Sequence, residues 1–348
     1  MKLNADTLRR LPGGIASCLM IAATAFWTYW GAGEMYHEGW WGAWYHRLPY
    51  LAPIAVTLLP MLISFRWPIV GGILIILVGG FALFTFSGDV AVIGLAIALV
   101  GAAFLVDGIF KRRSVQEARD LTLLWWRRHW RYLAGLGLPL LIFVGVSATM
   151  LPIVLTRVDD GDRGARLIEG NGVALIWAPE GPGWNWVQPW GGYPSWQSVA
   201  LYGVPPVGME DKPGYGRQGE DFVFATAADM AATNLCRYLS ADGTTLLETP
   251  QDVWRMPTRD EVVRSLGRHG VNAGCEWHGG EIPQQTACTV RPDKESPLWA
   301  TDHPVIYYWT VDSYSEERGY FVAYNGMVNA TRKSGGNPRH SYRCVREP

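Results

Sequence analysis

The sequence predicts a protein of two parts: an N-terminal α-helical membrane domain with five transmembrane helices, and a C-terminal α+β domain. Two observations carry this prediction. Residues 1–155 contain five long apolar stretches that are almost free of charge, whereas residues 167–348 alternate short apolar runs with glycine, proline and charged residues. The length of 348 residues also fits two domains.

Each apolar stretch is long enough to cross a bilayer. About 20 apolar residues span a hydrocarbon core of roughly 30 Å. A buried helix of a water-soluble domain would show a polar stripe at helical spacing, which these stretches lack. Four more stretches follow the first and no small-residue cleavage site does, so we expect a span there rather than a cleaved signal peptide. The predicted spans are 13–32, 49–65, 68–87, 90–110 and 132–155.

The distribution of basic residues predicts the orientation. The short loops on one side, 33–48 and 88–89, hold only Arg47. The other side collects eleven basic residues: Lys2, Arg9, Arg10, Arg66, Lys111, Arg112, Arg113, Arg119, Arg127, Arg128 and Arg131. The positive-inside rule therefore places the N-terminus in the cytoplasm and residues 156–348 outside.

The predicted spans favour an anchor or an assembly platform. Asp107 is their only acidic residue and lies near the cytoplasmic end, whereas pumps and ion transporters usually carry ionisable groups at mid-membrane depth. No span offers paired histidines for a haem. Two tryptophan-rich stretches, "GWWGAWYHR" (39–47) and "LLWWRRHWR" (123–131), are typical of interfacial anchors, with a contact surface for a membrane partner or a pigment as the alternative.

Charge and cysteine content limit the function of the second part. Residues 156–348 hold 18 Lys and Arg against 24 Asp and Glu, which argues against nucleic acid as a partner. Four cysteines lie in this part, an even number that permits two disulfides in an oxidising compartment. They are Cys236, Cys275, Cys288 and Cys344, and their spacing does not indicate a metal site.

The start of this part, "TRVDDGDRGAR" (156–166), is expected to be a charged, solvated hinge. Its three aspartates are an alternative calcium site, but they lack the regular series of oxygen ligands that calcium loops use.

Capping signals predict two helices in the second part. Residues 226–243 have helical spacing, with Thr226 as N-cap, Asp229 closing a capping box and Gly243 as the stop. The phrase "DVWRMPTRDEV" (252–262) contains the second start. There Thr258 is the expected N-cap and Glu261 closes the box, with Gly267 or Gly270 ending the helix.

Strands are predicted before and after these helices. "VALIWAP" (173–179) and "VIYYWTVDSYS" (305–315) have strand composition, and "SYRCVRE" (341–347) would be the last strand. Residues 319–334 place Asn325-Gly326 between two alternating runs, which is the strongest short hairpin signal.

The order of these motifs resembles the Lcl C-terminal, or DUF1566, family, which is related to the formylglycine-generating fold and to C-type lectin-like domains. The resemblance covers residues 167–348, with 180–222 as an insertion or variant loop, and rests on "GVALIWAP", "AADMAATNLCRYL", "WRMPTRDEV", "YYWTVDSYS", "YFVAYNGMVNATRKS" and "YRCVRE". It implies a C-type lectin-like α+β fold. It also implies that Cys236 pairs with Cys344 and Cys275 with Cys288, and that Trp254, Arg255, Pro257, Thr258 and Glu261 are scaffold residues.

Catalysis is disfavoured. The related fold includes an oxidase that holds copper with two cysteines, but "KSGGNPRHSYR" before Cys344 contains none, and disulfide-bonded cysteines cannot bind copper(I). Formylglycine-type oxidation therefore remains only a remote alternative. We expect no catalytic residue, no cofactor and no metal, and we expect His340 at the surface. The Glu-Pro-Asn and Trp-Asn-Asp motifs of calcium-dependent lectins are absent, since residues 184–186 read Trp-Asn-Trp.

Binding is the remaining function. Aromatic residues in loops give a large contact area at low entropic cost, and the alternative is that they fill the core of a coil-rich domain. The candidate binding residues are Trp184, Trp186, Trp190, Tyr193, Trp196 and Trp299. The leading hypothesis is a bacterial inner-membrane protein that displays a non-catalytic recognition domain in the periplasm, for a glycan or a protein partner. The alternative is an accessory or assembly subunit of a larger membrane complex.

The orientation can be tested with a reporter enzyme that is active only in the cytoplasm. A fusion near Arg119 should be active and a fusion after Pro348 should be silent, because eleven of the twelve basic residues in the first part lie on one side. The reverse pattern would overturn the orientation.

Overall fold

The computed structural model describes residues 5–85, 89–113, 125–184, 193–202 and 223–348. The chain forms two compact units, Met1–Leu155 and Thr156–Pro348, which are described separately.

The first unit is helical. Its five helices contain segments long and apolar enough to cross a membrane, so the prediction of five such helices is confirmed. The first helix extends beyond the predicted limit at residue 32 and includes Glu34. The helices are α1 (Ala5–His37), α2 (Leu48–Arg66), α3 (Pro68–Thr85), α4 (Asp89–Arg113) and α5 (Trp125–Leu155), with a short 3₁₀ helix at Trp44–Arg47.

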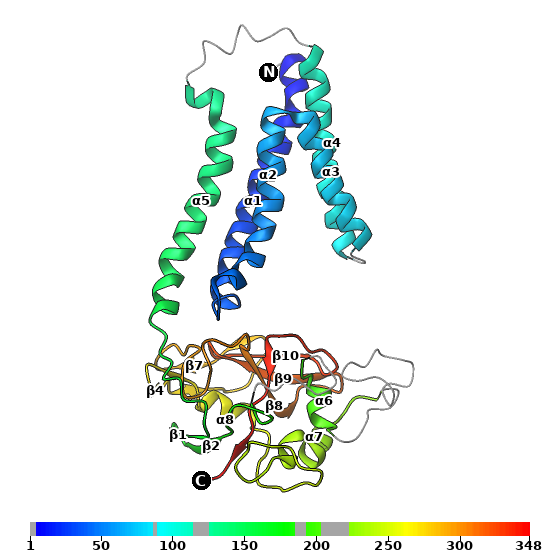
Figure 1. Ribbon diagram of the computed structural model, residues 1–348. Helices are drawn as coiled ribbons and strands as arrows, with labels where there is room; N and C mark the ends of the chain where they lie inside the picture. The colour runs from blue at the N-terminus through cyan, green and yellow to red at the C-terminus, as the bar shows by residue number, and fades with distance from the viewer. Residues whose placement is uncertain (1–4, 86–88, 114–124, 185–192, 203–222) are drawn as a thin grey trace. The chain divides into compact units, whose positions relative to one another are not determined.

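Helix α1 packs against α2, α4 and α5, while α3 and α4 lie together along their length (Figure 1). Glycines seven residues apart allow this close approach of α3 and α4. A Cβ atom on Gly72 would lie 2.7 Å from the carbonyl oxygen of Gly101, and one on Gly79 would lie 2.6 Å from that of Gly94. Larger residues at these positions would push the two helices apart.

The second unit is a small domain that contains several short sheets. A five-stranded sheet has the order β11-β8-β9-β10-β6, a three-stranded sheet has the order β1-β2-β12, and β3-β4 and β5-β7 form two further pairs. The strands are β1 (Arg166–Gly170), β2 (Val173–Trp177), β3 (Gly267–Arg268), β4 (Val271–Asn272), β5 (Cys275–Glu276), β6 (Gln284–Gln285), β7 (Ala287–Cys288), β8 (Tyr307–Ser313), β9 (Arg318–Ala323), β10 (Met327–Arg332), β11 (His340–Ser341) and β12 (Val345–Arg346).

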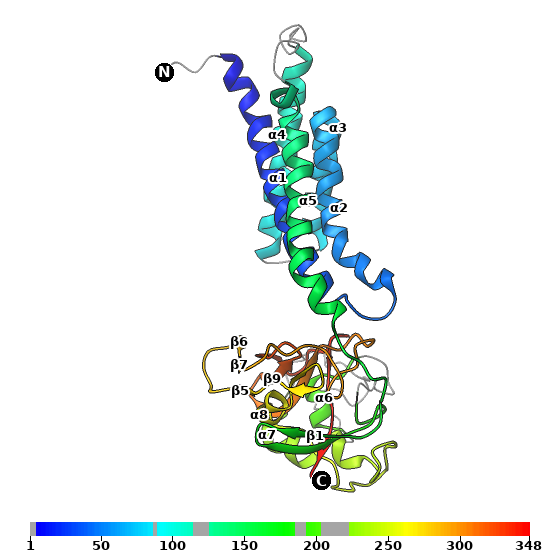
Figure 2. The same ribbon diagram turned by 90° about the vertical axis from the view of Figure 1, so that its left-hand side faces the viewer.

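Within the described residues, short α-helices accompany the sheets: α6 (Trp196–Ala200), α7 (Ala227–Thr233) and α8 (Arg259–Arg264), with a 3₁₀ helix at Leu235–Tyr238. Helix α8 packs against β5, β8 and β9, and Figure 2 shows it beside β5 and β9. Both predicted capping boxes are present. The Thr226 hydroxyl accepts from the Asp229 amide at 3.1 Å, and the Thr258 hydroxyl accepts from the Glu261 amide at 3.2 Å.

Both predicted helix ends are wrong. Helix α7 stops at Thr233 rather than near Gly243, because Asn234 is extended and its side chain donates to the Met230 carbonyl. Helix α8 stops at Arg264, and the glycines predicted to end it instead belong to the β3–β4 hairpin.

The predicted strands are present, except that the last one is divided in two. Strand β11 pairs parallel to β8, whereas β12 pairs antiparallel to β2, so the chain crosses from one sheet to the other between them. The crossing residues Tyr342, Arg343 and Cys344 are fully buried. The Asn325-Gly326 hairpin is confirmed, with Gly326 in the left-handed region at φ 85°.

The segment 156–166, which was expected to be a hinge, makes hydrogen bonds and ion pairs within the second unit. The Arg157 guanidinium donates to the Asp293 carboxylate at 3.0 Å, and the Val158 carbonyl accepts from the Ser296 amide at 3.1 Å. Asp159 accepts two hydrogen bonds from Thr301. Arginines within the segment pair with its own aspartates, so a stretch that looks solvated in the sequence is ordered.

Two buried clusters form the core of the second unit. The disulfide between Cys236 and Cys344 lies in one of them, in the expected pairing. His340 also lies there, which corrects its expected surface position. Its ring stacks on Trp309 with centroids 4.7 Å apart, and its Nδ1 lies 2.8 Å from the Asn337 side chain.

Burial of His340 predicts an acid-sensitive domain. Desolvation lowers the pKa of His340 from 6.5 to about 3. Below about pH 6.5 the unfolded chain takes up a proton that the folded domain excludes, so stability falls as the pH drops, by up to about 1.4 kcal/mol per unit. In urea unfolding of the full chain in detergent, His340→Gln should be less pH-dependent than the wild type between about pH 6.5 and 4.5. The exposed His278 is the matched control, and His278→Gln should keep the wild-type slope. Equal slopes in all three proteins would contradict this account.

Candidate binding surface

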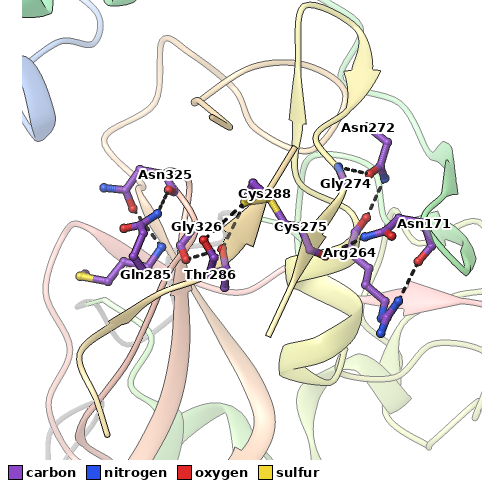
Figure 3. Close-up of a disulfide and its surroundings, with 11 residues drawn as sticks. Asn171, Arg264, Asn272, Gly274, Cys275, Gln285, Thr286, Cys288, Asn325 and Gly326 are labelled. Carbon is purple, nitrogen blue, oxygen red and sulfur yellow. Dashed lines mark hydrogen bonds between the residues drawn. A yellow bond between two sulfur atoms is a disulfide. The ribbon is translucent and has the colours of Figure 1, made fainter. Parts of the chain in front are cut away.

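A loop closed by a disulfide projects from the second unit between β5 and β7. Cys275 and Cys288 are bonded, in the expected pairing, and stand opposite each other in the β5–β7 ladder (Figure 3). The loop between them is largely solvent-exposed and includes Glu276, His278 and Glu281. We call residues 275–288 the disulfide loop.

The N-terminal end of the disulfide loop is fixed by hydrogen bonds from side-chain amides. Asn171, in the β1–β2 turn, donates to the Cys275 carbonyl at 2.7 Å, and its own carbonyl accepts from Arg264 at 3.1 Å. Asn272 donates to the Arg264 carbonyl at 2.6 Å and accepts from the Gly274 amide at 2.8 Å (Figure 3). These hydrogen bonds connect the N-terminal end of the loop to helix α8 and to the three-stranded sheet.

The C-terminal end of the disulfide loop is hydrogen-bonded to the β9–β10 turn. The Thr286 amide and hydroxyl both donate to the Gly326 carbonyl, at 3.0 and 2.8 Å. Gln285 also donates to the Asn325 carbonyl (Figure 3). A Cβ atom on Gly326 would lie 2.6 Å from the Thr286 hydroxyl, so glycine is needed here for contact as well as for conformation. Strand β6 then extends the five-stranded sheet beside β10.

The chain on either side of the disulfide loop forms a ribbon. The Val290 amide donates to the Ala273 carbonyl at 3.1 Å, and the Asp293 amide donates to the Gly267 carbonyl at 3.2 Å. Farther from the loop, the Asp293 carboxylate binds both Arg157 and Arg268. The ribbon therefore connects the disulfide loop to the residues that follow α5.

A cluster of aromatic and arginine side chains lies at the disulfide loop; Tyr314 and Arg318 are exposed, Arg259 and Trp277 are half-buried, and Tyr320 is buried. The Arg259 guanidinium stacks over the rings of Trp277 and Tyr320, 3.9 and 4.5 Å from their centroids. Tyr314 meets Tyr320 edge to face at 5.3 Å, and Arg318 lies 5.4 Å over Tyr314. We call these five residues the aromatic–arginine cluster.

Separate elements position the members of this cluster. Arg259 is the first residue of α8, and its backbone amide donates to Asp312 at 2.6 Å. Trp277 belongs to the disulfide loop, where its indole donates to the Gln284 side chain at 3.0 Å. Trp277 is half-buried, and 43% of Tyr314 is exposed. The cluster therefore presents aromatic ring surface and hydrogen-bond donors next to the disulfide loop.

Three of the predicted binding residues are instead core residues, because each ring packs inside the domain. Trp184 donates to the Tyr308 hydroxyl at 2.6 Å. Trp196 donates to the Thr310 carbonyl at 2.8 Å, and Trp299 stacks on Tyr308 with centroids 3.9 Å apart. All three are almost completely buried, so their prediction as ligand contacts is corrected.

The other predicted binding residues divide into two groups. Tyr193 is 41% exposed. Trp186 and Trp190 lie outside the described residues. Among the candidates that the structure describes, Tyr193 alone presents its ring to solvent.

The expected scaffold residues lie in the segment that leads into α8, where Arg255 pairs with Val345 of β12. Trp254 is buried and donates to the Ser240 carbonyl at 2.9 Å. Arg255 bridges Glu261 and Glu347, both at 2.7 Å. The Pro257 carbonyl accepts from the Val311 amide at 2.9 Å, and the Thr258 amide donates to Glu261 at 2.8 Å. Each of the five expected scaffold residues therefore makes a structural contact.

The aromatic–arginine cluster was not predicted from the sequence. One signal was available, since Trp277 lies between two cysteines that were expected to pair, in a loop rich in glycine and polar residues. The remaining members come from positions 259, 314, 318 and 320, and no spacing rule joins these to residue 277. Only the fold brings them together.

Searches of protein-family models, of curated proteins and of solved structures find no match to this chain. The resemblance to the Lcl C-terminal family therefore stays a prediction.

Opening the disulfide loop should destabilise it without unfolding the domain. In the chain-entropy model, a disulfide between cysteines with a sequence separation of 13 contributes about 3 kcal/mol to the free energy of unfolding, which is lost when the disulfide is removed. We expect Cys275→Ser/Cys288→Ser to lower the free energy of unfolding by about this amount and to admit protease cleavage within residues 276–287. Cys18→Ser is the control, because Cys18 lies in α1 and forms no disulfide. Unchanged stability and protease resistance in the double variant would show that the link does not order the loop.

Proposed function

We propose that this protein is a membrane-anchored, non-catalytic recognition protein whose second unit binds a glycan through the aromatic–arginine cluster. In this proposal the second unit is a lectin-like domain related to the Lcl C-terminal family, displayed in the periplasm of a bacterial inner membrane. The first unit then serves as the anchor.

The chemistry of the cluster carries the proposal. Sugar rings have apolar C–H faces that stack on aromatic rings and hydroxyl groups that need hydrogen-bond partners. The exposed ring of Tyr314 and the half-buried ring of Trp277 supply the first kind of contact. Arg259 and the loop side chains around it supply the second. Few side chains would have to become ordered on binding, because both ends of the disulfide loop are already held by hydrogen bonds.

Compartment and anchoring support the same proposal. Five helices apolar enough to cross a membrane indicate membrane association, and two disulfides indicate an oxidising compartment for the second unit. The basic-residue distribution favours the exterior side for this unit. A glycan-binding domain facing the cell envelope fits these three observations.

A glycan array probed with the full chain in mild detergent tests the proposal. The wild type should bind a defined set of glycans, and Tyr314→Ala should weaken binding by roughly 30-fold, the effect expected for a contact residue that contributes about 2 kcal/mol. The melting temperature should change little, because Tyr314 is exposed. Tyr45→Ala is the matched control, since Tyr45 is an exposed tyrosine of the first unit.

The accessory-subunit alternative makes the opposite prediction. A wild-type chain that binds no glycan, and that co-purifies with stoichiometric partner subunits after gentle solubilisation, would replace recognition by assembly as the function.

A further inference from the structure

The Arg259 guanidinium is held in place but not neutralised. It lies over two aromatic rings, yet no described residue accepts a hydrogen bond from it or forms an ion pair with it. The hydrogen bond that Arg259 does make, to Asp312, comes from its backbone amide. No described residue therefore occupies its five N–H donors, which a ligand could use.

Many other arginines of the second unit pair with a carboxylate, although Arg346 resembles Arg259 in lying over a ring, that of Trp254. Seven of them bind a carboxylate of the same unit: Arg157, Arg163, Arg166, Arg237, Arg255, Arg264 and Arg268. Arg318, the second arginine of the cluster, donates to the Ala330 carbonyl. Arg259, by contrast, forms no ion pair with a described residue, and it lies over Trp277, one of the rings that the proposed function assigns to ligand contact.

We propose that Arg259 binds a carboxylate of the ligand, and that the ligand class is an acidic glycan. This inference rests on the proposed function. A guanidinium presents a planar fork that matches the two oxygens of a carboxylate, and stacking on aromatic faces is a property of arginine that lysine does not share. Trp277 and Tyr320 fix the plane of the fork before the ligand arrives, which lowers the entropic cost of forming the pair.

The surroundings favour an acidic ligand over a neutral one. A neutral sugar would satisfy the donors with hydroxyl groups but leave the half-buried charge unpaired. A carboxylate satisfies both, and charge-assisted hydrogen bonds are roughly twice as strong as neutral ones. A uronate ring combines a stacking face with a carboxylate, so one residue of an acidic glycan would contact both Trp277 and Arg259.

A matched pair of probes tests this inference. The probes are trimers of glucuronate, galacturonate and mannuronate and the methyl esters of the same trimers, which keep the ring and remove the charge. Binding to the full chain in detergent is measured by titration calorimetry. The wild type should bind at least one acid on the order of tenfold or more tightly than its ester, as expected for a hydrogen-bonded charge pair. Arg259→Gln should bind the acid and the ester equally, and Arg259→Lys should retain only part of the preference.

The outcomes separate this inference from the proposed function. Equal binding of acid and ester by the wild type, or a preference that survives in Arg259→Gln, would overturn the carboxylate site and leave glycan recognition standing. Absence of binding of every acid and every ester would overturn both. Arg237→Gln is the control, because Arg237 is a partly exposed arginine of the same unit that already pairs with Asp252 at 2.5 Å and lies outside the aromatic–arginine cluster, and this variant should keep the wild-type preference.

Discussion

The buried carboxylate of Asp293 joins two arginines that are far apart in the sequence, and the arrangement of the second unit depends on this contact. Arg157 follows the last helix of the first unit, and Arg268 lies in the β3–β4 hairpin. The Arg157 and Asp293 side chains are only 5% and 3% exposed. Removing one partner of such a buried pair costs about 3–5 kcal/mol, because it leaves an uncompensated charge. The contact therefore fixes both the start of the domain and the ribbon that carries the disulfide loop.

Sequence reasoning succeeded where the determining contacts are local. A capping box needs two residues three positions apart, and the Asn325-Gly326 turn needs a residue that accepts positive φ, so both could be identified without the fold. Predictions from the sequence were wrong where contacts between residues far apart in the chain determine the local structure. Helix α8 ends early because its following glycines are used in a hairpin. The segment 156–166 is ordered because Ser296 and Thr301, more than a hundred residues later, bind its backbone and side chains.

The candidate site also depends on contacts between residues far apart in the sequence. Loop position alone made Trp184, Trp196 and Trp299 candidates for ligand contact, but Trp184 and Trp196 have an indole N–H partner inside the domain and Trp299 stacks on Tyr308 there. Trp277 is half-buried because it packs at the edge of the core, against the buried ring of Tyr320 and under the guanidinium of Arg259. A sequence identifies an aromatic residue, whereas burial depends on neighbours that only the fold supplies.

Oxidative footprinting can show whether the aromatic–arginine cluster is the ligand-binding surface. The full chain in detergent is exposed to hydroxyl radicals with and without a soluble acidic polysaccharide, and oxidation is mapped by mass spectrometry. The account predicts that the polysaccharide protects Trp277 and Tyr314, while the exposed Trp44 of the first unit is oxidised to the same extent in both samples. Protection confined to other residues of the second unit, such as Tyr193, or no protection at all, would contradict it.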